Sequence, residues 1–275
     1  MKRLMAAVFV VLGVGWGQSA RLPMEPLRDS GQSVTGAFEG WFKNADGTFS
    51  MLVGYYNRNL KQDVDVPVGA ENSIGPGGPD RGQPTHFTAG RQWGVFVVTV
   101  PRDFGSGKLT WSLTANGQTT TIPLSLNPLW EISPFAETGI GNTPPQVMFE
   151  SQAAVQGPVS KMVGSLSASV GKALPLVVRV ADDAKVGRGA IAPAGAPATV
   201  TWSKYRGPGA VQFGSTVMEK IEGGAAYQAR AISSATFFAP GEYVLLVVAN
   251  DWSGDGGRGF QCCWTTAQVK VTVRP

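Results

Sequence analysis

The sequence predicts an all-β protein built as two tandem β-sandwich domains that follow a cleaved signal peptide. Three observations support this prediction. The 36 glycines and 19 prolines make up a fifth of the 275 residues and separate short apolar runs, as the many tight turns of a β protein require. Several of these runs alternate apolar and polar residues with a period of two. About 255 residues remain after the signal peptide, which suits two domains of ordinary size.

The first twenty residues have the layout of a secretory signal peptide. Lys2 and Arg3 give a positive start, residues 4–14 form an apolar run too short to span a bilayer, and small residues follow up to Ala20. A buried N-terminal helix is the alternative interpretation. No later segment reaches the ~18 uninterrupted apolar residues of a membrane helix. We therefore expect export to the periplasm or the cell exterior, cleavage within a few residues of Ala20, and no membrane insertion.

The charge of the exported chain argues against nucleic acid as a partner. Cleavage removes Lys2 and Arg3 but no acid, so the formal net charge falls from +4 to +2. Blocks of like charge are absent from the sequence. So weak a field does not indicate a nucleic-acid or anionic-membrane surface as the ligand.

The N-terminal part of the exported chain carries clear strand signals. Aromatic and β-branched runs lie on either side of the turn NADG at 44–47, which is a strong hairpin signal. The segment VDVPV at 64–68 is typical of an edge strand, because its proline cannot donate to an interior ladder. In KLTWSLTA, at 108–115, apolar and polar residues alternate without exception, so one face is buried and contains Trp111. About seven strands are expected between residues 33 and 126, as in one sandwich.

Proline and glycine mark the boundary between the two domains. The segment NPLWEISPFAETGIGNTPPQ contains four prolines and two glycines, which forbid a regular element and predict a stiff linker. Strand signals resume after it, and the run at 243–249 is apolar on both faces, as a central strand is. The expected organisation is a signal peptide at 1–20, a flexible leader at 21–32, a first sandwich at 33–127, the linker at 128–146 and a second sandwich at 147–275.

Part of the second domain resembles the immunoglobulin-like and polycystic-kidney-disease-type (PKD-like) β-sandwiches of exported bacterial proteins. The resemblance rests on Trp202 in an early strand, the Gly-Pro-Gly bend at 207–209, and the F-x-x-P-G-x-Y run at 237–243. It implies an immunoglobulin-like sandwich here and, because GKLTWSLTANG echoes GEYVLLVVAND, a related one in the first domain. The paired inter-sheet cysteines of immunoglobulins are missing, so the resemblance implies a core held by packing alone. It implies no particular activity, since such folds host many roles.

Cys262 and Cys263 are the only cysteines in the chain, and they are adjacent. Neighbouring Cα atoms across a trans peptide lie ~3.8 Å apart, below the ~4.4–6.8 Å usual for a disulfide. A bond between them therefore cannot lie within a regular strand. If the final strand already includes Cys262, both thiols stay reduced and one is buried; if the preceding loop extends further, a vicinal disulfide closes it. An intermolecular bridge and metal binding are further alternatives, although two thiolates without histidine make a poor zinc site.

Side chains for catalysis and metal binding are scarce. His86 is the only histidine and lies in the loop DRGQPTHF, and no G-x-S-x-G elbow provides a serine nucleophile. A glycoside hydrolase needs only two facing carboxylates, so that class is not excluded by the residue count. Asn250, Asp251 and Asp255 offer oxygen atoms of the kind that Ca²⁺ prefers, but their spacing fits no EF-hand. We expect no catalytic residue, no metal site and no cofactor.

Aromatic residues provide the clearest binding candidates. In GYYNRN, at 54–59, two tyrosines point to opposite faces at a strand end and lie beside polar side chains, as in many sugar-binding surfaces. Trp111 and Trp202 are expected in the core, whereas the tryptophans that flank the cysteine-containing loop are expected at the surface. The binding candidates are Tyr55, Tyr56, Asn57, Arg58, Arg81, His86, Trp252 and Trp264.

These observations together predict a non-catalytic binding or structural protein. It would present loops to another extracytoplasmic protein or to the cell surface, and a carbohydrate-binding accessory module is the alternative. A two-carboxylate glycoside hydrolase is a more distant alternative. The protein-interaction hypothesis requires an exposed apolar patch or an unpaired edge strand, and the glycan hypothesis requires at least two coplanar exposed rings.

Overall fold

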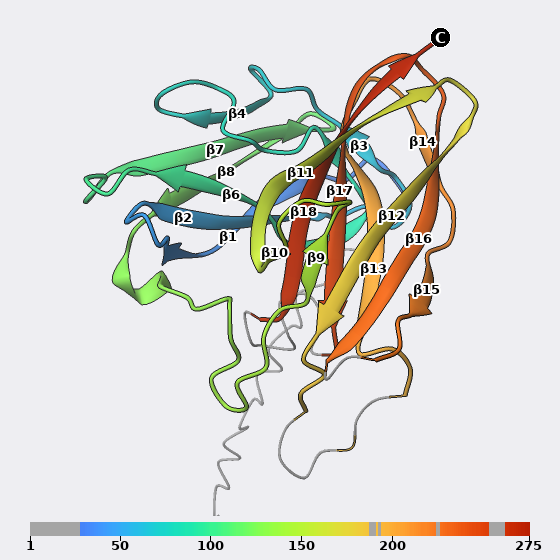
Figure 1. Cartoon of the computed structure of the whole chain (residues 1–275). Helices are drawn as coiled ribbons and strands as arrows, with labels where there is room; N and C mark the ends of the chain where they lie inside the picture. The colour runs from blue at the N-terminus through green and yellow to red at the C-terminus, as the bar shows by residue number, and fades with distance from the viewer. Residues whose placement is uncertain (1–27, 187–190, 192–193, 224–225, 253–261) are drawn as a thin grey trace, which may run out of the picture.

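The computed structural model of the chain is all-β, as the sequence predicts (Figure 1). The only helical element in the described residues is a 3-10 turn, η1 (Pro128–Trp130), and no helix there is long and apolar enough to cross a membrane. The expected signal peptide at 1–20, and the leader as far as residue 27, lie outside the described residues. The structure describes residues 28–186, 191, 194–223, 226–252 and 262–275.

The N-terminal half, residues 28–125, contains eight strands, compared with about seven expected. They are β1 (Val34–Lys43), β2 (Phe49–Asn57), β3 (Val64–Asp65), β4 (Asn72–Gly75), β5 (His86–Phe87), β6 (Gly90–Val100), β7 (Lys108–Ala115) and β8 (Gln118–Ser125). They form three antiparallel sheets with the orders β1-β2-β6, β4-β7-β8 and β3-β5. The turn at 44–47 joins β1 to β2, as predicted.

The core of the N-terminal half follows the alternation seen in the sequence. Along β7, four side chains that include Trp111 are buried, and those between them are partly or fully exposed. The Trp111 ring packs against Phe87 and Phe96, with ring centroids 6.3 and 5.3 Å away. Within the expected edge strand at 64–68, the two residues of β3 pair with β5, and the Val66 amide also donates to the Thr85 carbonyl at 2.9 Å.

The described end of the leader is attached to the N-terminal half. The Leu60 amide donates to the Arg28 carbonyl at 2.9 Å, and Lys61 forms a 2.7 Å ion pair with Asp29. Residues 28–32 were expected to be flexible, but these bonds fix the chain beside the turn that follows β2. The sequence did not reveal this attachment, because backbone hydrogen bonds between separate segments leave no periodic pattern in the sequence.

In the C-terminal half, residues 146–275, the described residues form ten strands in two sheets. They are β9 (Gln146–Met148), β10 (Val155–Gln156), β11 (Pro158–Ser169), β12 (Ala173–Asp182), β13 (Ala198–Arg206), β14 (Val211–Phe213), β15 (Val217–Lys220), β16 (Tyr227–Phe237), β17 (Gly241–Asp251) and β18 (Trp264–Arg274). One sheet has the order β10-β9-β12-β16-β14, with β15 also paired to β16, and the other has the order β11-β18-β17-β13. In the second sheet, β11 and β18 are parallel. Both sheets contribute side chains to one hydrophobic core that includes Trp202, Phe237 and Tyr243.

The two halves pack against each other through the outer face of β17. Leu245, Val247 and Ala249 belong to the core of the C-terminal half. Leu246, from the alternate row, belongs to the core of the N-terminal half, and Val248 packs against the same core. The run at 243–249 is therefore apolar on both faces because each face is covered by a different half. Its position between β18 and β13 confirms the predicted central strand.

Trp264 lies buried in this contact, so its expected surface position is wrong. Only 1% of it is exposed, and it clusters with Phe42 and Leu52 of the N-terminal half. Its ring covers Gly94, whose φ is +46°; a Cβ atom built there would lie within 3.0 Å of three atoms of the Trp264 ring. Alternation assigned Trp264 to an outward row, and the outward face of β18 is covered by the other half.

In the structure the two adjacent cysteines form a disulfide with each other. Cys262 and Cys263 are both buried and precede the first residue of β18. The sulfur atoms of Cys262 and Cys263 lie 3.9 and 3.5 Å from the carbonyl oxygen of Asn142. The vicinal pair therefore contacts the segment that connects the two halves.

Candidate functional site

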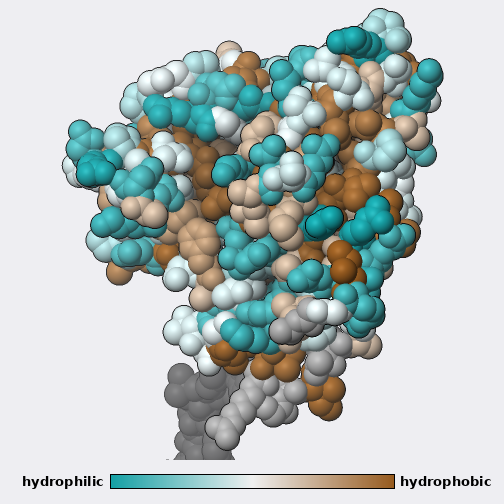
Figure 2. Space-filling view, viewed as in Figure 1, coloured by the Kyte–Doolittle hydropathy of each residue, from teal (hydrophilic) through white to brown (hydrophobic). Residues whose placement is uncertain are grey.

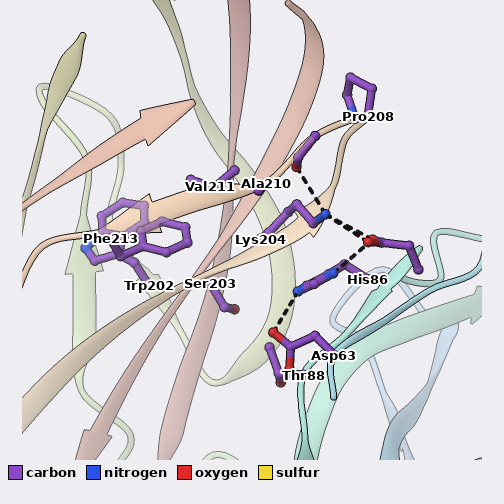
Figure 3. Close-up of a pocket in the computed structure, with 12 residues that line it drawn as sticks. Asp63, His86, Thr88, Trp202, Ser203, Lys204, Pro208, Ala210, Val211 and Phe213 are labelled. Atoms are coloured by element: carbon purple, nitrogen blue, oxygen red, sulfur yellow. Dashed lines mark hydrogen bonds and ion pairs between the residues drawn. The ribbon is translucent and has the colours of Figure 1, made fainter. Parts of the chain in front are cut away.

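A pocket of about 430 Å³ lies where the two halves meet (Figure 3). Strands β3 and β5 of the N-terminal half form one side, and β13 and β14 of the C-terminal half form the other. This volume is within the ~300–1,000 Å³ range of small-ligand pockets. The side chains that define its chemistry are Asp63, Asp65, His86, Trp202, Lys204 and Phe213.

His86 is the centre of the polar wall and is held between two carboxylates. Asp65 and His86 are directly opposite each other in the β3–β5 ladder, and His86 Nδ1 lies 2.9 Å from Asp65 Oδ1. His86 Nε2 lies 3.5 Å from Asp63 Oδ2. The His86 side chain is only 11% exposed, whereas the Asp63 and Asp65 side chains are 49% and 59% exposed. The acids therefore form the rim of the pocket, and the imidazole fixes their positions.

Lys204 extends this polar network across the contact between the halves. Its ammonium lies 3.0 Å from Asp65 Oδ1 and donates to the Gly209 carbonyl at 3.2 Å. Partial burial opposes ionisation of Asp65, but the hydrogen bonds from His86 and Lys204 prevail and lower its pKa below the ordinary value. Asp65 is therefore an anion near neutral pH and accepts hydrogen bonds.

The opposite wall of the pocket is apolar. Trp202 of β13 and Phe213 of β14 lie together on the side away from His86 (Figure 3). Trp202 also belongs to the core of the C-terminal half, which confirms its expected burial and holds the ring in place. A ligand in this pocket would meet aromatic rings on one side and carboxylate oxygens on the other.

The loop that carries His86 is anchored to the end of β13. Arg206 forms a two-pronged ion pair with Asp80, with nitrogen–oxygen distances of 2.9 and 2.8 Å. The Thr85 amide donates to the Tyr205 carbonyl at 3.1 Å, and the Tyr205 hydroxyl donates to the Gly82 carbonyl. These bonds hold the loop of the N-terminal half against β13 of the C-terminal half, so they fix one wall of the pocket relative to the other.

Two of the predicted binding residues bond to the backbone beside the pocket but do not line it. The buried Tyr55 hydroxyl accepts a hydrogen bond from the Thr88 amide at 3.0 Å, and burial raises the pKa of this phenol to about 12. Asn57 is fully buried, and its side-chain amide donates to the Phe87 carbonyl at 3.0 Å. The segments GYYNRN and DRGQPTHF are thus brought together, but Tyr55 and Asn57 fix the backbone on either side of β5.

The remaining predicted residues lie outside the pocket. Tyr56 points to the opposite face from Tyr55, and the Arg58 guanidinium lies 5.7 Å from its ring centroid. Arg81 donates to the Pro76 carbonyl at 2.7 Å, within its own loop. Trp252 is half-buried. Among the eight candidates, only His86 lines this pocket, and the loop at 253–261 between the predicted tryptophans lies outside the described residues.

The sequence interpretation missed Asp63, Asp65 and Lys204. The alternation that buries Trp202 places Lys204 in the same row of β13, and a lysine in a buried row needs an anionic or carbonyl partner. That signal was present in VTWSKY, but its partner Asp65 is 139 residues away along the chain. Spacing alone therefore gave no indication of the pair.

Exposed apolar side chains occur elsewhere, on the segment between the halves. Leu129 is 90% exposed, Trp130 is 49% exposed and Phe135 is 39% exposed. The ring centroids of Trp130 and Phe38 lie 5.7 Å apart, and the Phe135 ring packs edge-on against the Phe42 ring. The face of the molecule drawn in Figure 2 shows apolar residues in patches separated by polar ones, not as one continuous area.

Comparisons with known proteins leave the family open. No family model matches the chain, and no curated protein matches it. Among solved structures, a match is the crystal structure of the S-layer protein SbsC domains 4 and 5. It is 12% identical, and the match covers 89% of this chain and 98% of that chain with a TM-score of 0.23. So low a TM-score carries no argument about fold or function, and the resemblance to immunoglobulin-like and PKD-like domains stays a prediction.

Proposed function

We propose that this chain is an exported, non-catalytic binding protein whose pocket between the halves holds one sugar residue of a cell-surface glycan. The observation that carries the proposal is the pairing of an aromatic wall, Trp202 and Phe213, with a wall of carboxylates fixed by His86. Sugars have apolar faces formed by C–H groups and edges of hydroxyl groups. Aromatic rings suit the first and charged acceptors suit the second.

The electrostatics of the pocket favour binding over hydrolysis. A glycoside hydrolase needs one carboxylic acid whose pKa is raised, so that it can protonate the leaving group. Asp65 has a lowered pKa, because its hydrogen bonds to His86 and Lys204 outweigh its partial burial. Asp65 therefore suits an acceptor role and not the role of the acid.

The fold that we propose for each half is an immunoglobulin-like sandwich. In the C-terminal half, the two sheet orders, the parallel pairing of β11 with β18 and the single shared core support this proposal. In the N-terminal half, the support is weaker and consists of the sheets β1-β2-β6 and β4-β7-β8 around Trp111. The export signal expected at 1–20 supports a location outside the cytoplasm.

A glycan array followed by calorimetric titration of the best ligand tests the proposed function. Asp63→Asn keeps the Oδ1 atom that accepts from the Ala89 amide at 2.9 Å but removes the charge at the rim. Phe213→Ala removes part of the aromatic wall. We expect Asp63→Asn to weaken binding about tenfold or more, because a hydrogen bond to a charged group contributes ~1.5–3 kcal/mol. We expect Phe213→Ala to weaken binding to a similar extent, because the apolar face of the sugar loses an aromatic contact.

Asp29→Asn is the matched control, since Asp29 is an exposed, ion-paired acid outside the pocket. This control should leave affinity within about twofold of the wild type, because surface pairs contribute little. A blank array at high protein concentration would contradict the proposal. So would a glycan that binds Asp63→Asn and Phe213→Ala as tightly as the wild type.

A protein partner is the second candidate for the same pocket, and the half-exposed carboxylates of Asp63 and Asp65 favour it. They would pair with a lysine or arginine side chain of the partner, whose cation would also contact the Trp202 and Phe213 rings. Binding of lysine- or arginine-containing peptides, with no glycan bound, would favour this candidate over the first.

A further inference from the structure

The core of the C-terminal half ends in a polar cluster that the proposed function does not use. The inward row of β12 runs through Val178 and Val180 to Asp182, and the inward row of β17 runs through Ala249 to Asp251. Asp182 and Asp251 are only 4% and 9% exposed. Figure 1 shows the arrow of β12 ending at the same lower edge at which β18 begins. Two carboxylates thus occupy positions at the end of an apolar core.

The segment before β9 brings these two strand ends together. Asn142 is 3% exposed, and its Nδ2 atom donates to Asp251 Oδ2 at 2.5 Å. The next residue, Thr143, donates to Asp183 through its amide at 3.2 Å and its hydroxyl at 2.9 Å. Residues 142–143 therefore connect the end of β12 to the end of β17.

Within the part of the chain that the structure describes, two buried oxygen atoms of this cluster lack a hydrogen-bond partner. They are Asp182 Oδ2 and Asn142 Oδ1. The other Asp182 oxygen accepts from the Ala184 amide at 2.8 Å. The Lys185 ammonium donates to the Gly141 carbonyl at 2.7 Å and lies 3.3 Å from Asp183, so two of its three donors are directed at groups other than Asp182. A buried acceptor without a partner is costly, and a buried carboxylate is more so.

We propose that Asp182, Asp251 and Asn142 bind a calcium ion at this end of the core. All of the donors are oxygen atoms from two carboxylates and one amide, which is the ligand chemistry that Ca²⁺ prefers. Calcium takes ~6–8 oxygen ligands in flexible geometry and accepts water and backbone carbonyls among them. Zinc favours nitrogen and sulfur ligands, and magnesium demands a stricter octahedron.

The number of carboxylates determines the calcium affinity that we expect for this site. Among the residues that the structure describes, no three acidic, histidine or cysteine side chains are grouped to hold a metal. Two carboxylates imply weak binding, in the ~10⁻⁴–10⁻³ M range of extracellular modules. The proposal revises the sequence expectation of no metal and also differs from the set Asn250, Asp251 and Asp255. Alternation places Asn250 on the other face of β17, and Asp255 lies outside the described residues.

Calcium titration of the exported chain tests this proposal. We expect calorimetry at pH 7.5 to show saturable calcium binding. We also expect 5 mM Ca²⁺ to raise the thermal unfolding midpoint above its value in a chelator, because a ligand that binds the folded state stabilises it. Asp182→Asn should weaken binding about tenfold or more and abolish the shift. This variant removes a buried charge, so we expect it to fold.

Asp183→Asn is the matched control, because Asp183 neighbours Asp182 but already accepts from Thr143 and pairs with Lys185. We expect its calcium affinity to stay within about threefold of the wild type. The proposal is overturned if the wild type shows neither heat nor a midpoint shift with Ca²⁺. It is also overturned if the shift persists in Asp182→Asn. None of these outcomes depends on glycan binding, so the two proposals fail separately.

Discussion

Gly94→Ala tests whether the contact between the halves is a packed interface. Gly94 has a φ of +46°, and an added Cβ atom would lie within 3.0 Å of three atoms of the Trp264 ring. A side chain at positive φ costs on the order of 1 kcal/mol, and overpacking of a core costs ~1–3 kcal/mol more. The expected loss in the free energy of unfolding is therefore about 2–4 kcal/mol.

Gly117→Ala supplies the matched control. Gly117 has a φ of +73°, and an added Cβ atom would meet nothing within 4 Å. Its expected loss is only about 1 kcal/mol, the cost of the backbone conformation alone. Urea unfolding of the exported chain, followed by tryptophan fluorescence and by circular dichroism, measures both values. Losses that agree within about 0.5 kcal/mol would refute the reasoning, because Trp264 would then move aside without cost.

Three further predictions concern charge and redox state. Burial, opposed by the Ala184 hydrogen bond and reinforced by the Asp251 charge, raises the pKa of Asp182 from 3.8 to about 7. Between these pH values the folded state holds a proton that the unfolded state releases, so stability falls as pH rises. We expect urea unfolding in the presence of a chelator to show that the free energy of unfolding of the wild type falls by up to about 4 kcal/mol relative to Asp182→Asn between pH 4 and pH 7. This value follows from about 1.4 kcal/mol for each pKa unit. A difference between the two proteins that does not change with pH would contradict the raised pKa of Asp182. Lys204→Met should lower the free energy of unfolding by about 1–2 kcal/mol, because the ammonium of Lys204 is buried. Lys61→Met, which breaks an exposed ion pair, should lower it by less than about 0.5 kcal/mol. Equal losses would argue against a stabilising role of Lys204 in the contact between the halves. Intact mass after alkylation should show no label on the two adjacent cysteines without reductant and two labels after reduction, whereas labelling without reductant would rule out the disulfide.

Local signals in the sequence account for much of the fold. The alternation at 108–115 fixes which face of β7 is buried, and the turn at 44–47 sets the hairpin of β1 with β2. These features depend on neighbouring residues, so they are visible in the sequence. The run at 243–249 shows that β17 is buried on both faces, but it does not show that the second face is covered by the other half.

The pocket depended on contacts that sequence spacing does not encode. Asp65 and His86 come from one half and Trp202 and Lys204 from the other, so the pocket exists only once the two halves pack. Trp264 was assigned to the surface because alternation distinguishes inward from outward but does not say what lies outside the sheet. Lys204 was the available signal, since a lysine in the buried row of β13 requires a partner.

Hydrogen–deuterium exchange with and without the best array glycan tests the central claim most directly, because it locates the bound ligand on the chain. If the pocket holds a sugar residue, amides of β5, of β14 and of the bend at 207–210 should exchange more slowly in the complex. Amides around the distant turn at 116–117 should exchange at unchanged rates. Protection confined to segments outside the pocket, or none at saturating glycan, would contradict the account.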